Sequence, residues 1–550
     1  MAIRWCLLGA ALLSACSGAD KDSDGKDTTD SETLPSSDAD VVVTLEPVGS
    51  PTPLVWRVNV TASAPVSIVA AFDAEDGHHL ELPLDATVST SHLRLAKGFH
   101  PETPYTVTVT ATDADGGVVT VDGGTLTTDP LPPGFPTVVV HTVDSARVAP
   151  GFTLALLRPN LNDAGASGDY LVALDNQARV AWYYEPTDAL LLITAFQDGT
   201  LVGVASDPES DGGPIHRFDW EGDKLESWVP AGIKNYGIPC QVSGFHHEAH
   251  ETPSGTIVAL SKEPLSGVQL PTDYNDPALR TGTIGADVIF EFDPNTPDCA
   301  VKADIDVAQL LDTSRIGYDS LENSHFDGEL DWGHGNAIWV DPHDGGFIVS
   351  LRNQDAIVKV QDGELDWILG APANWVSPWK EKLLTAVGPL VWNYHQHSPQ
   401  MHPTDPGRML VMDNGGPRIF PFDGNPLPGT ETWYSRIVEF QIDDTARTVA
   451  QTWELDKLGG EGFFSTFVGD ADYLVESDHV LACFGYLERV GKLSTFERGY
   501  GGRSVRIVEV AYTDPDDVVL DVEFTALGGR EDEGWTSYRS QRIPNLYGLP

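Results

Sequence analysis

The sequence has few basic residues for its length. Only 33 Lys and Arg stand against 82 Asp and Glu in 550 residues, which gives a formal net charge of −49. Proteins that hold nucleic acid neutralise its phosphates with clustered Lys and Arg, and attraction to anionic lipid headgroups needs a similar basic cluster. The composition therefore excludes nucleic acid as a partner, and it excludes charge-driven binding to a membrane surface.

Long hydrophobic runs are also missing. The apolar run near the start, Trp5 to Leu13, is too short to cross a bilayer. It follows Arg4 and precedes small residues, which is typical of a secretory signal. The Leu-Ser-Ala-Cys stretch that ends at Cys16 resembles the lipobox of bacterial lipoproteins, whose cysteine becomes the lipid-bearing first residue. We expect a signal peptide over 1–15 and a lipid anchor on Cys16, with an ordinary signal peptide as the alternative.

The lipobox resemblance also implies a location. Ser17 follows the cysteine where Asp would be the retention signal, so we expect the protein in the cell envelope, at the outer membrane. Residues 16–40 are acidic and rich in small residues, without any apolar pattern. This composition predicts a flexible tether.

Cysteine is scarce, with five in the chain. Cys6 leaves with the signal peptide and Cys16 takes the lipid, so Cys240, Cys299 and Cys483 remain in an oxidising compartment. Three cysteines allow at most one internal disulfide. Cys240–Cys299 is the favoured pair, although sequence alone does not settle the connectivity.

Short alternating strands fill residues 41–129, with a spacing typical of a β-sandwich. Pro101, Thr103 and Tyr105 precede one such strand and resemble the tyrosine corner of a fibronectin type III domain. The resemblance implies a spacer or interaction domain. Residues 130–136 read Pro-Leu-Pro-Pro-Gly-Phe-Pro and predict a stiff linker.

The remaining residues, 137–550, contain a loose repeat. Each unit has a turn, an apolar strand, a second strand ending in an acidic turn, and a third strand that often carries Trp. Six units begin at Gly168, Gly199, Gly255, Gly346, Gly407 and Asp478. We therefore predict an all-β chain, with a six-bladed β-propeller after the small sandwich. Strands near Pro136 and near the C-terminus are expected to close the ring.

Histidine is concentrated in one part of this repeat. Nine of the 16 histidines lie between His246 and His402. Three groups occur just before the first apolar strand of a unit: His246-His247-Glu248-Ala249-His250, Asp331-Trp332-Gly333-His334-Gly335-Asn336 and Trp392-Asn393-Tyr394-His395-Gln396-His397-Ser398-Pro399. Because the strand that enters each blade of a propeller lines the central channel, these three positions should converge near the axis.

Converging imidazoles suit a metal site, acid–base catalysis or a nucleophile. Zinc with three such ligands and one open position fits the count. However, Arg352 in Ser350-Leu-Arg-Asn-Gln354 is a permanent cation whose planar donors suit a sulfate or phosphate group. We therefore favour anion chemistry over a metal, and we predict no metal and no cofactor.

Several motifs occur together in a defined order. They are His247 within His-His-Glu, Asp331-Trp-x-His334-x-Asn336, Ser350-x-Arg352-x-Gln354, Trp367-Ile-Leu-Gly370, Gln396-His397-x-Pro399, Ser537-Tyr538-Arg539 and Arg542-Ile543. This set resembles the motifs of bacterial arylsulfate sulfotransferases, and the resemblance extends over roughly residues 170–550. It implies a six-bladed propeller, in agreement with the repeat.

The resemblance also implies a ping-pong reaction that needs no 3′-phosphoadenylyl donor (PAPS). His397 would attack the sulfur of an aryl sulfate, release a phenol, and pass the sulfuryl group to a second phenol. His247, His334 and Arg352 would bind the transferring oxygens, and one imidazole would protonate the leaving phenolate. The sequence has no Gly-rich phosphate loop, which agrees with such a mechanism.

Other residues of these motifs have supporting roles. We expect Asn336 to orient His334 or an oxygen, and Trp332 and Tyr394 to face aryl rings, with packing between blades as an equal alternative. Neighbours on a strand point to opposite faces, so only one of His246 and His247 should enter the channel. We prefer His247 and keep His246 in reserve. His250 and His395 are interpreted as additional, structural histidines.

Two other classes of function stay open. One is a lipid-anchored propeller that binds a partner without catalysis, and the other is a metal-dependent hydrolase that uses the histidines. The expected partners of the favoured reading are an aryl sulfate donor, a phenolic acceptor and the membrane through Cys16, with a homodimer left open. The sequence does not specify the natural substrates, the general acid or the oligomeric state.

Overall fold

The structure is a computed structural model that describes residues 36–159, 168–205, 212–231, 237–323, 328–429, 432–488, 503–526 and 534–548. The predicted signal peptide, the lipid anchor on Cys16 and most of the predicted tether lie outside these ranges. The described residues contain no α-helix, and their only helices are three 3-10 turns, so the all-β prediction is confirmed. None of these helices has the length and hydrophobicity to cross a membrane.

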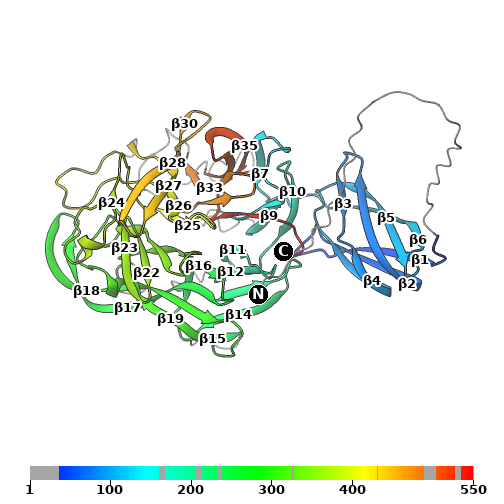
Figure 1. Ribbon diagram of the computed structural model, residues 1–550, viewed down its shortest axis with the longest axis horizontal. Helices are drawn as coiled ribbons and strands as arrows, with labels where there is room; N and C mark the ends of the chain where they lie inside the picture. The colour runs from blue at the N-terminus through cyan, green and yellow to red at the C-terminus, as the bar shows by residue number, and fades with distance from the viewer. Residues whose placement is uncertain are drawn as a thin grey trace, which may run out of the picture.

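The N-terminal module is a sheet system built around one long strand, β2 (Figure 1). Its strands are β1 (Val41–Pro47), β2 (Trp56–Ala74), β3 (His79–Glu81), β4 (Asp85–Ala96), β5 (Pro104–Asp113) and β6 (Val118–Thr127). The first half of β2 pairs with β1 and β4, and its second half pairs with β3 and β5. Because the two halves of β2 pair with different strands, β2 joins two layers around one core. The hydroxyl of Tyr105 accepts the N–H of His100 at 3.0 Å, as a tyrosine corner requires.

Six further sheets follow. Sheet 1 holds β8 (Phe152–Pro159), β9 (Tyr170–Leu174), β10 (Val180–Tyr184), β36 (Trp535–Thr536) and β37 (Ser540–Ile543); sheet 2 holds β11 (Leu190–Ala195), β12 (Leu201–Ala205), β13 (Ile215–Phe218), β14 (Lys224–Pro230) and β15 (Ile238–Cys240); sheet 3 holds β16 (Phe245–Glu251), β17 (Ile257–Asp273), β18 (Asp276–Asp293) and β19 (Ala300–Asp306).

The other three sheets complete the set. Sheet 4 holds β20 (Gly335–Val340), β21 (Phe347–Leu351), β22 (Ala356–Gln361) and β23 (Glu364–Gly370); sheet 5 holds β24 (Thr385–Ala386), β25 (His397–Met401), β26 (Arg408–Asp413), β27 (Arg436–Asp443) and β28 (Thr448–Leu455); sheet 6 holds β7 (Thr137–Val143), β31 (Phe464–Ser465), β32 (Asp470–Leu474), β33 (His479–Glu488), β34 (Ser504–Ala511) and β35 (Asp514–Thr525). A ribbon of β29 (Lys457–Leu458) and β30 (Glu461–Gly462) and the 3-10 turns η1 (Val307–Leu310), η2 (Arg352–Gln354) and η3 (Trp379–Lys382) lie in the connections.

Six buried apolar clusters lie between consecutive sheets, and the cluster between sheets 6 and 1 closes the circle. Strand β17 shows how the sequence encodes this arrangement. Ile257 and Ala259 pack toward sheet 2, whereas Val258 and Leu260 pack toward sheet 4. Because both faces are buried, the strand is a continuous apolar run instead of an alternating one.

Both ends of the ring sequence close it. Strand β7 pairs with β35 in sheet 6, and β36 and β37 pair with β8 in sheet 1. Strands from the beginning and the end of the ring therefore share two adjacent sheets. The expected closure by strands near Pro136 and near the C-terminus is confirmed.

One strand of each sheet faces the centre of the ring. These inner strands are β37, β11, β16, β20, β25 and β32, and each contacts the next in a closed cycle. Figure 1 shows β11, β16 and β25 near the middle. In β16, β20 and β25 the pairing register shifts at the beginning of the strand, which marks a β-bulge in each.

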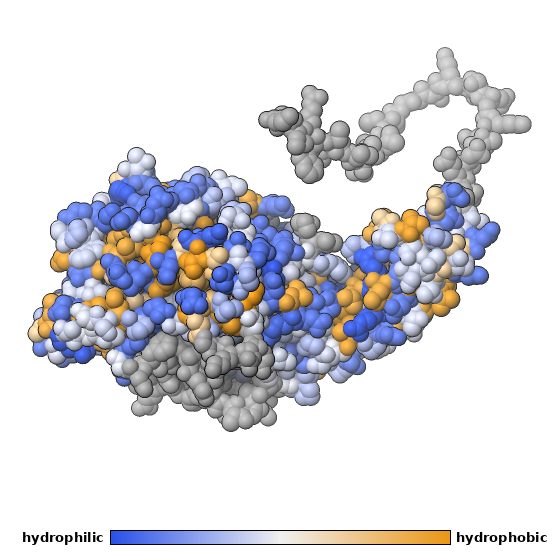
Figure 2. Space-filling model, turned by 90° about the horizontal axis from the view of Figure 1, so that it is seen from below, coloured by the Kyte–Doolittle hydropathy of each residue, from blue (hydrophilic) through white to orange (hydrophobic). Residues whose placement is uncertain are grey.

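Two connections hold neighbouring parts together. Cys240 and Cys299 form a disulfide with a Cα–Cα distance of 5.0 Å, as predicted, and it ties β15 of sheet 2 to sheet 3. Cys483 is free and buried. The N-terminal module contacts sheet 2 through the ion pair between Lys97 and Glu221, at 2.6 Å. Figure 2 shows the two modules in contact, with hydrophobic areas on the surface of both.

Candidate active site

Three predicted histidines lie close together at the beginning of inner strands. The ring of His247 lies 5.1 Å from that of His334, measured between centroids. The ring of Tyr538 lies 6.0 Å from His247 and 6.0 Å from His397. The convergence expected for three separate repeat units is therefore present, and Tyr538 lies between its members.

The backbone at these histidines is irregular. His247 has φ of 58° and His334 has φ of 49°, in the left-handed region that side chains rarely adopt. Together with the β-bulge after His246, this conformation breaks the alternation of β16. The Nδ1 atoms of His246 and His247 lie 2.7 Å apart. The alternation from which we expected only one of the pair to enter the site is therefore interrupted, because a bulge re-aims side chains.

His246 extends the cluster toward a buried carboxylate. Its Nε2 lies 3.8 Å from Asp287, and burial lowers the pKa of His246 to about 3, with a smaller contribution from Lys262. The same carboxylate explains the glycines on either side of His334. A Cβ atom at Gly333 or Gly335 would lie 2.6 or 2.7 Å from Asp287, so no side chain fits there.

His397 is buried and is held by its Nδ1 atom. Asn414 donates its amide N–H groups to the carbonyls of Ser465 and Val468, so its Oδ1 must accept the proton of His397 Nδ1, at 2.7 Å. This hydrogen bond places the lone pair of the imidazole on Nε2. Nε2 accepts only a long contact from the N–H of Val468, at 3.2 Å.

Burial keeps the central imidazoles neutral. It lowers the pKa of His397 well below the usual value, and Arg352 lowers it further. Burial likewise lowers the pKa of His247, with His246 and His334 as further causes. At neutral pH both imidazoles are therefore uncharged.

His334 has a different environment. Its Nδ1 lies 2.5 Å from the carboxylate of Asp331, which also accepts Nζ of Lys262 at 2.8 Å. Burial opposes ionisation of Asp331, but His334 and Lys262 hold its pKa well below the usual range. The carboxylate fixes the orientation of the His334 ring through Nδ1.

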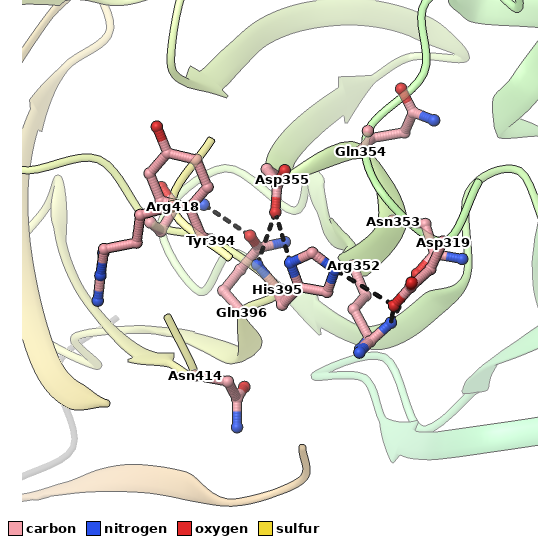
Figure 3. Close-up of polar contacts among 12 residues, drawn as sticks. Asp319, Arg352, Asn353, Gln354, Asp355, Tyr394, His395, Gln396, Asn414 and Arg418 are labelled. Carbon is pink, nitrogen blue, oxygen red and sulfur yellow. Dashed lines mark hydrogen bonds and ion pairs between the residues drawn. The ribbon is translucent and has the colours of Figure 1, made fainter. Parts of the chain in front are cut away.

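Arg352 lies in the 3-10 turn η2, directly after β21. Its Nη1 donates to Asp319 at 3.0 Å and to the side-chain oxygen of Asn353 at 2.7 Å (Figure 3). These bonds hold one edge of the guanidinium. Because Arg352 lowers the pKa of His397, the cation acts on the same site as the histidines.

Asn336 acts on the backbone near His397. Its side-chain amide donates to the backbone carbonyl of Gln396 at 2.8 Å. The backbone carbonyl of Asn336 accepts the hydroxyl of Tyr538. It makes no hydrogen bond to the ring of His334 among the described residues. Its place therefore differs from the expected one, because the amide supports the residue before His397.

The two predicted aromatic contacts differ from each other. Trp332 is 1% exposed, donates its indole N–H to the carbonyl of Arg315 and belongs to the cluster between sheets 3 and 4. It packs in the core, so the expectation that it faces an aryl ring is not met. Tyr394 is half-buried, with its ring 5.5 Å from Phe420 and the guanidinium of Arg418 5.7 Å from its centroid.

Sequence reasoning missed three residues of the site. Tyr538 lies in a motif that carried the family resemblance but had no role. Lys262 and Asn414 lie in or directly after ordinary strands, β17 and β26, and only the folded chain brings them to the histidines. The sequence around them contains no pattern that would have identified them.

A different group has the compactness of a metal site. Within the described ranges, the only His, Cys, Asp or Glu side chains with three ligand atoms within 4.8 Å of one another are His78, His100 and Asp175. They lie between the N-terminal module and sheet 1. Among the described residues, the central histidines do not form such a group.

Comparison with known proteins places this site in a family. The model of the arylsulfotransferase (ASST) family matches residues 140–538. The chain belongs to the arylsulfotransferase family. The match begins within β7 and ends at Tyr538, so it covers the ring up to the residues before β37 and excludes the N-terminal module.

Two relatives in this family carry the name arylsulfate sulfotransferase AssT. The protein of Escherichia coli O6:H1 is 26% identical over 363 residues, which cover 56% of this chain and 57% of the relative. The protein of Lelliottia amnigena is 30% identical over 229 residues, which cover 38% of this chain and 35% of the relative. The chain thus spans about half the length of the first relative and about a third of the second.

Solved structures give a weaker likeness. A protein from Lactobacillus plantarum aligns over 71% of this chain and 99% of its own, with 10% identity and a TM-score of 0.35. A score of this size does not establish a common fold.

Proposed function

We propose that this member of the arylsulfotransferase family is a PAPS-independent aryl sulfotransferase that works through a sulfated histidine. The observation that carries the proposal is the state of His397. It is buried and neutral, its Nδ1 is fixed by Asn414, and its Nε2 lone pair lies in a site shared with Arg352 and His334. Such an imidazole is suited to attack an electrophile.

The proposal includes the architecture of the ring. Six sheets joined by six apolar clusters, with a closed cycle of inner strands, support a six-bladed β-propeller in which each sheet is one blade. The histidines then lie at one mouth of the central channel, where the inner strands begin.

In the first half-reaction, Nε2 of His397 attacks the sulfur of an aryl sulfate. The N–S bond forms while the bond between sulfur and the aryl oxygen breaks. Charge on the sulfuryl oxygens is met by Arg352, whose Nη1 is bonded to protein and whose Nε and Nη2 make no hydrogen bond among the described residues. As in phosphoryl transfer, stabilisation of charge and correct positioning account for most of the catalysis.

His334 is the general acid in this proposal. Its Nδ1 is fixed by the carboxylate of Asp331, whereas burial keeps His247 and His397 neutral. His334 therefore gives its proton to the leaving phenolate. In the second half-reaction it takes the proton of the acceptor phenol, whose oxygen attacks sulfur and breaks the N–S bond. His397 is restored without a cofactor.

The location forms part of the same proposal. A lipid on Cys16 and the acidic tether would hold the enzyme at the membrane surface of the cell envelope, with the sandwich as a fibronectin type III-like spacer. Labelling of cells with a radioactive fatty acid tests this, since Cys16→Ser should abolish incorporation into the protein.

The function is tested with 4-nitrophenyl sulfate as donor and phenol as acceptor. We expect nitrophenol release that depends on phenol, parallel lines in double-reciprocal plots, and a mass increase of one sulfuryl group on the peptide containing His397. Release without acceptor would identify a hydrolase. The absence of release with several aryl sulfates would overturn the proposal and leave the non-catalytic binding protein.

A further inference from the structure

A line of charged side chains runs from the interior of the ring to Arg352 (Figure 3). Asp355 accepts the backbone N–H of His395 at 2.7 Å, and its carboxylate also lies 3.0 Å from His395 Nδ1. On the other side of the ring, His395 Nε2 lies 3.4 Å from Asp319. Asp319 in turn accepts Nη1 of Arg352 at 3.0 Å.

The members of this line differ in burial. Asp355 and His395 are fully enclosed, whereas the side chain of Asp319 is 32% exposed and that of Arg352 is 14% exposed. The buried pair therefore forms an anchor, and the partly exposed pair lies at the site. His395 was expected to be an additional structural histidine, and its position between two carboxylates gives it a definite task.

The charges in the line alternate. Burial opposes a charge on His395, but Asp355 and the contact with Asp319 raise its pKa above the usual value. Burial also opposes ionisation of Asp319, yet His395 and Arg352 lower its pKa. His395 and Asp319 thus each lie between two groups of opposite charge, which makes the line cooperative.

Backbone conformation provides a separate observation. Asp319, Asp355 and His395 have φ of 72°, 48° and 49°, all in the left-handed region. Such conformations cost free energy and persist where the surroundings fix them, most often at functional sites. Three of them along one line of contacts indicate that its geometry is held for a purpose.

We propose that Asp319 is a positioning residue that orients Arg352 toward the transferring sulfuryl group, with His395 and Asp355 holding Asp319 in place. A free Arg side chain samples many rotamers, and ordering it at each turnover would cost entropy. A guanidinium clamped along one edge presents the other edge to sulfuryl oxygens without that cost. The inference rests on the proposed function, because it assigns a reason for the clamp.

A double-mutant cycle tests this role. Asp319→Asn keeps the size of the side chain and removes its charge, so we expect kcat/KM for 4-nitrophenyl sulfate to fall about 10- to 100-fold, the range for supporting residues of a reactive centre. In an Arg352→Ala background the same change should have almost no effect, because Asp319 acts through Arg352. Asp319→Glu should restore part of the activity.

Asp312→Asn is the matched control. Asp312 lies in the same loop and accepts the backbone N–H and the hydroxyl of Ser314, but it has no contact with Arg352. It should retain wild-type kcat/KM. Equal losses from Asp319→Asn with and without Arg352, or activity within twofold of wild type, would overturn the inference.

A second readout does not need turnover. In a His397→Ala background, calorimetry measures binding of 4-nitrophenyl sulfate, and Asp319→Asn should weaken it only when Arg352 is present. If the wild type proves inactive, the proposed function fails, but this arm still decides whether Asp319 orients Arg352 toward an anion. Equal affinity of His397→Ala with and without Asp319→Asn, both retaining Arg352, would show that Asp319 does not orient Arg352.

Discussion

The protein contains two histidine groups, one at the interface with the N-terminal module and one at the centre of the ring. They differ in the hydrogen-bond partners that hold their imidazole rings. In the interface group, Nε2 of His100 lies 2.7 Å from Asp175, and its ring stacks on His78 at 3.7 Å. The other carboxylate oxygen of Asp175 accepts two backbone N–H groups of its own turn. These bonds join the N-terminal module to sheet 1 and use both oxygens of the carboxylate, whereas Nδ1 of His100 has no hydrogen-bond partner among the described residues.

The central group is held more sparingly. His397 is fixed through Nδ1 by Asn414, and His334 is fixed through Nδ1 by Asp331. In both, Nε2 makes no strong bond to the described residues. A ring nitrogen without a strong protein partner in two neighbouring units is available to a substrate, which supports the proposed reactive role. The interface group has the composition of a metal site, but the central group has the features of a catalytic one.

The largest expected effect separates the two groups. His397→Ala should lower kcat for aryl sulfate transfer by at least about 10⁴-fold, because the covalent route needs the nucleophile. It should leave the thermal stability of the N-terminal module unchanged. Initial rates with 4-nitrophenyl sulfate and phenol measure the loss.

The converse substitution completes the test. His100→Ala removes the partner of Asp175 and should lower the free energy of unfolding by about 2 kcal/mol, with kcat close to that of the wild type. Denaturant unfolding followed by tryptophan fluorescence reports the first quantity. A large loss of kcat in His100→Ala would mean that the interface group takes part in the reaction.

A smaller effect concerns the tautomer of His397. Asn414→Ala should lower kcat about 10- to 100-fold, because the proton on Nδ1 loses its acceptor and the ring loses its orientation. KM for the donor should change little, since Asn414 has no path to the sulfuryl group except through His397. Asn393→Ala is a suitable control, because Asn393 is also fully buried but bonds to Gln396. Equal kcat losses in both variants would indicate general disruption.

The sequence predicted those features that depend on strand period and repeat position. Apolar runs such as Ile257 to Leu260 indicated the strands of the repeat, and the position of each histidine group indicated an inner strand. Closure of the ring by strands from its two ends was also expected. These features are local patterns repeated along the chain, so each repeat reinforces the next.

The predictions at His246, Trp332 and Asn336 depended on features that a local pattern does not contain. A bulge and a left-handed residue in β16 interrupt the alternation that assigned His246 and His247 to opposite faces. The neighbours of Trp332 and Asn336 come from other sheets, as do Asn414 and Tyr538 in the site. Contacts that span many residues leave no pattern in either segment, so only the folded chain reveals them.

The smallest expected effect is a dependence of stability on pH at the interface group. Burial, with a contribution from His100, lowers the pKa of His78 to about 4 in the folded protein. In the unfolded chain the pKa of this side chain is about 6.5. The unfolded state therefore binds more protons between these values, so this contribution is complete above pH 6.5 and is lost as pH falls toward 4. Asp175, Arg179 and Asp76 also act on His78, and all three are retained in the variant. His78→Gln should remove this part of the dependence of stability on pH, and Tm measured at pH 7, 6, 5 and 4 for both proteins tests it. Parallel curves of Tm against pH for wild type and variant would show that His78 is not held neutral. The contrast between the two histidine groups would then lose this support.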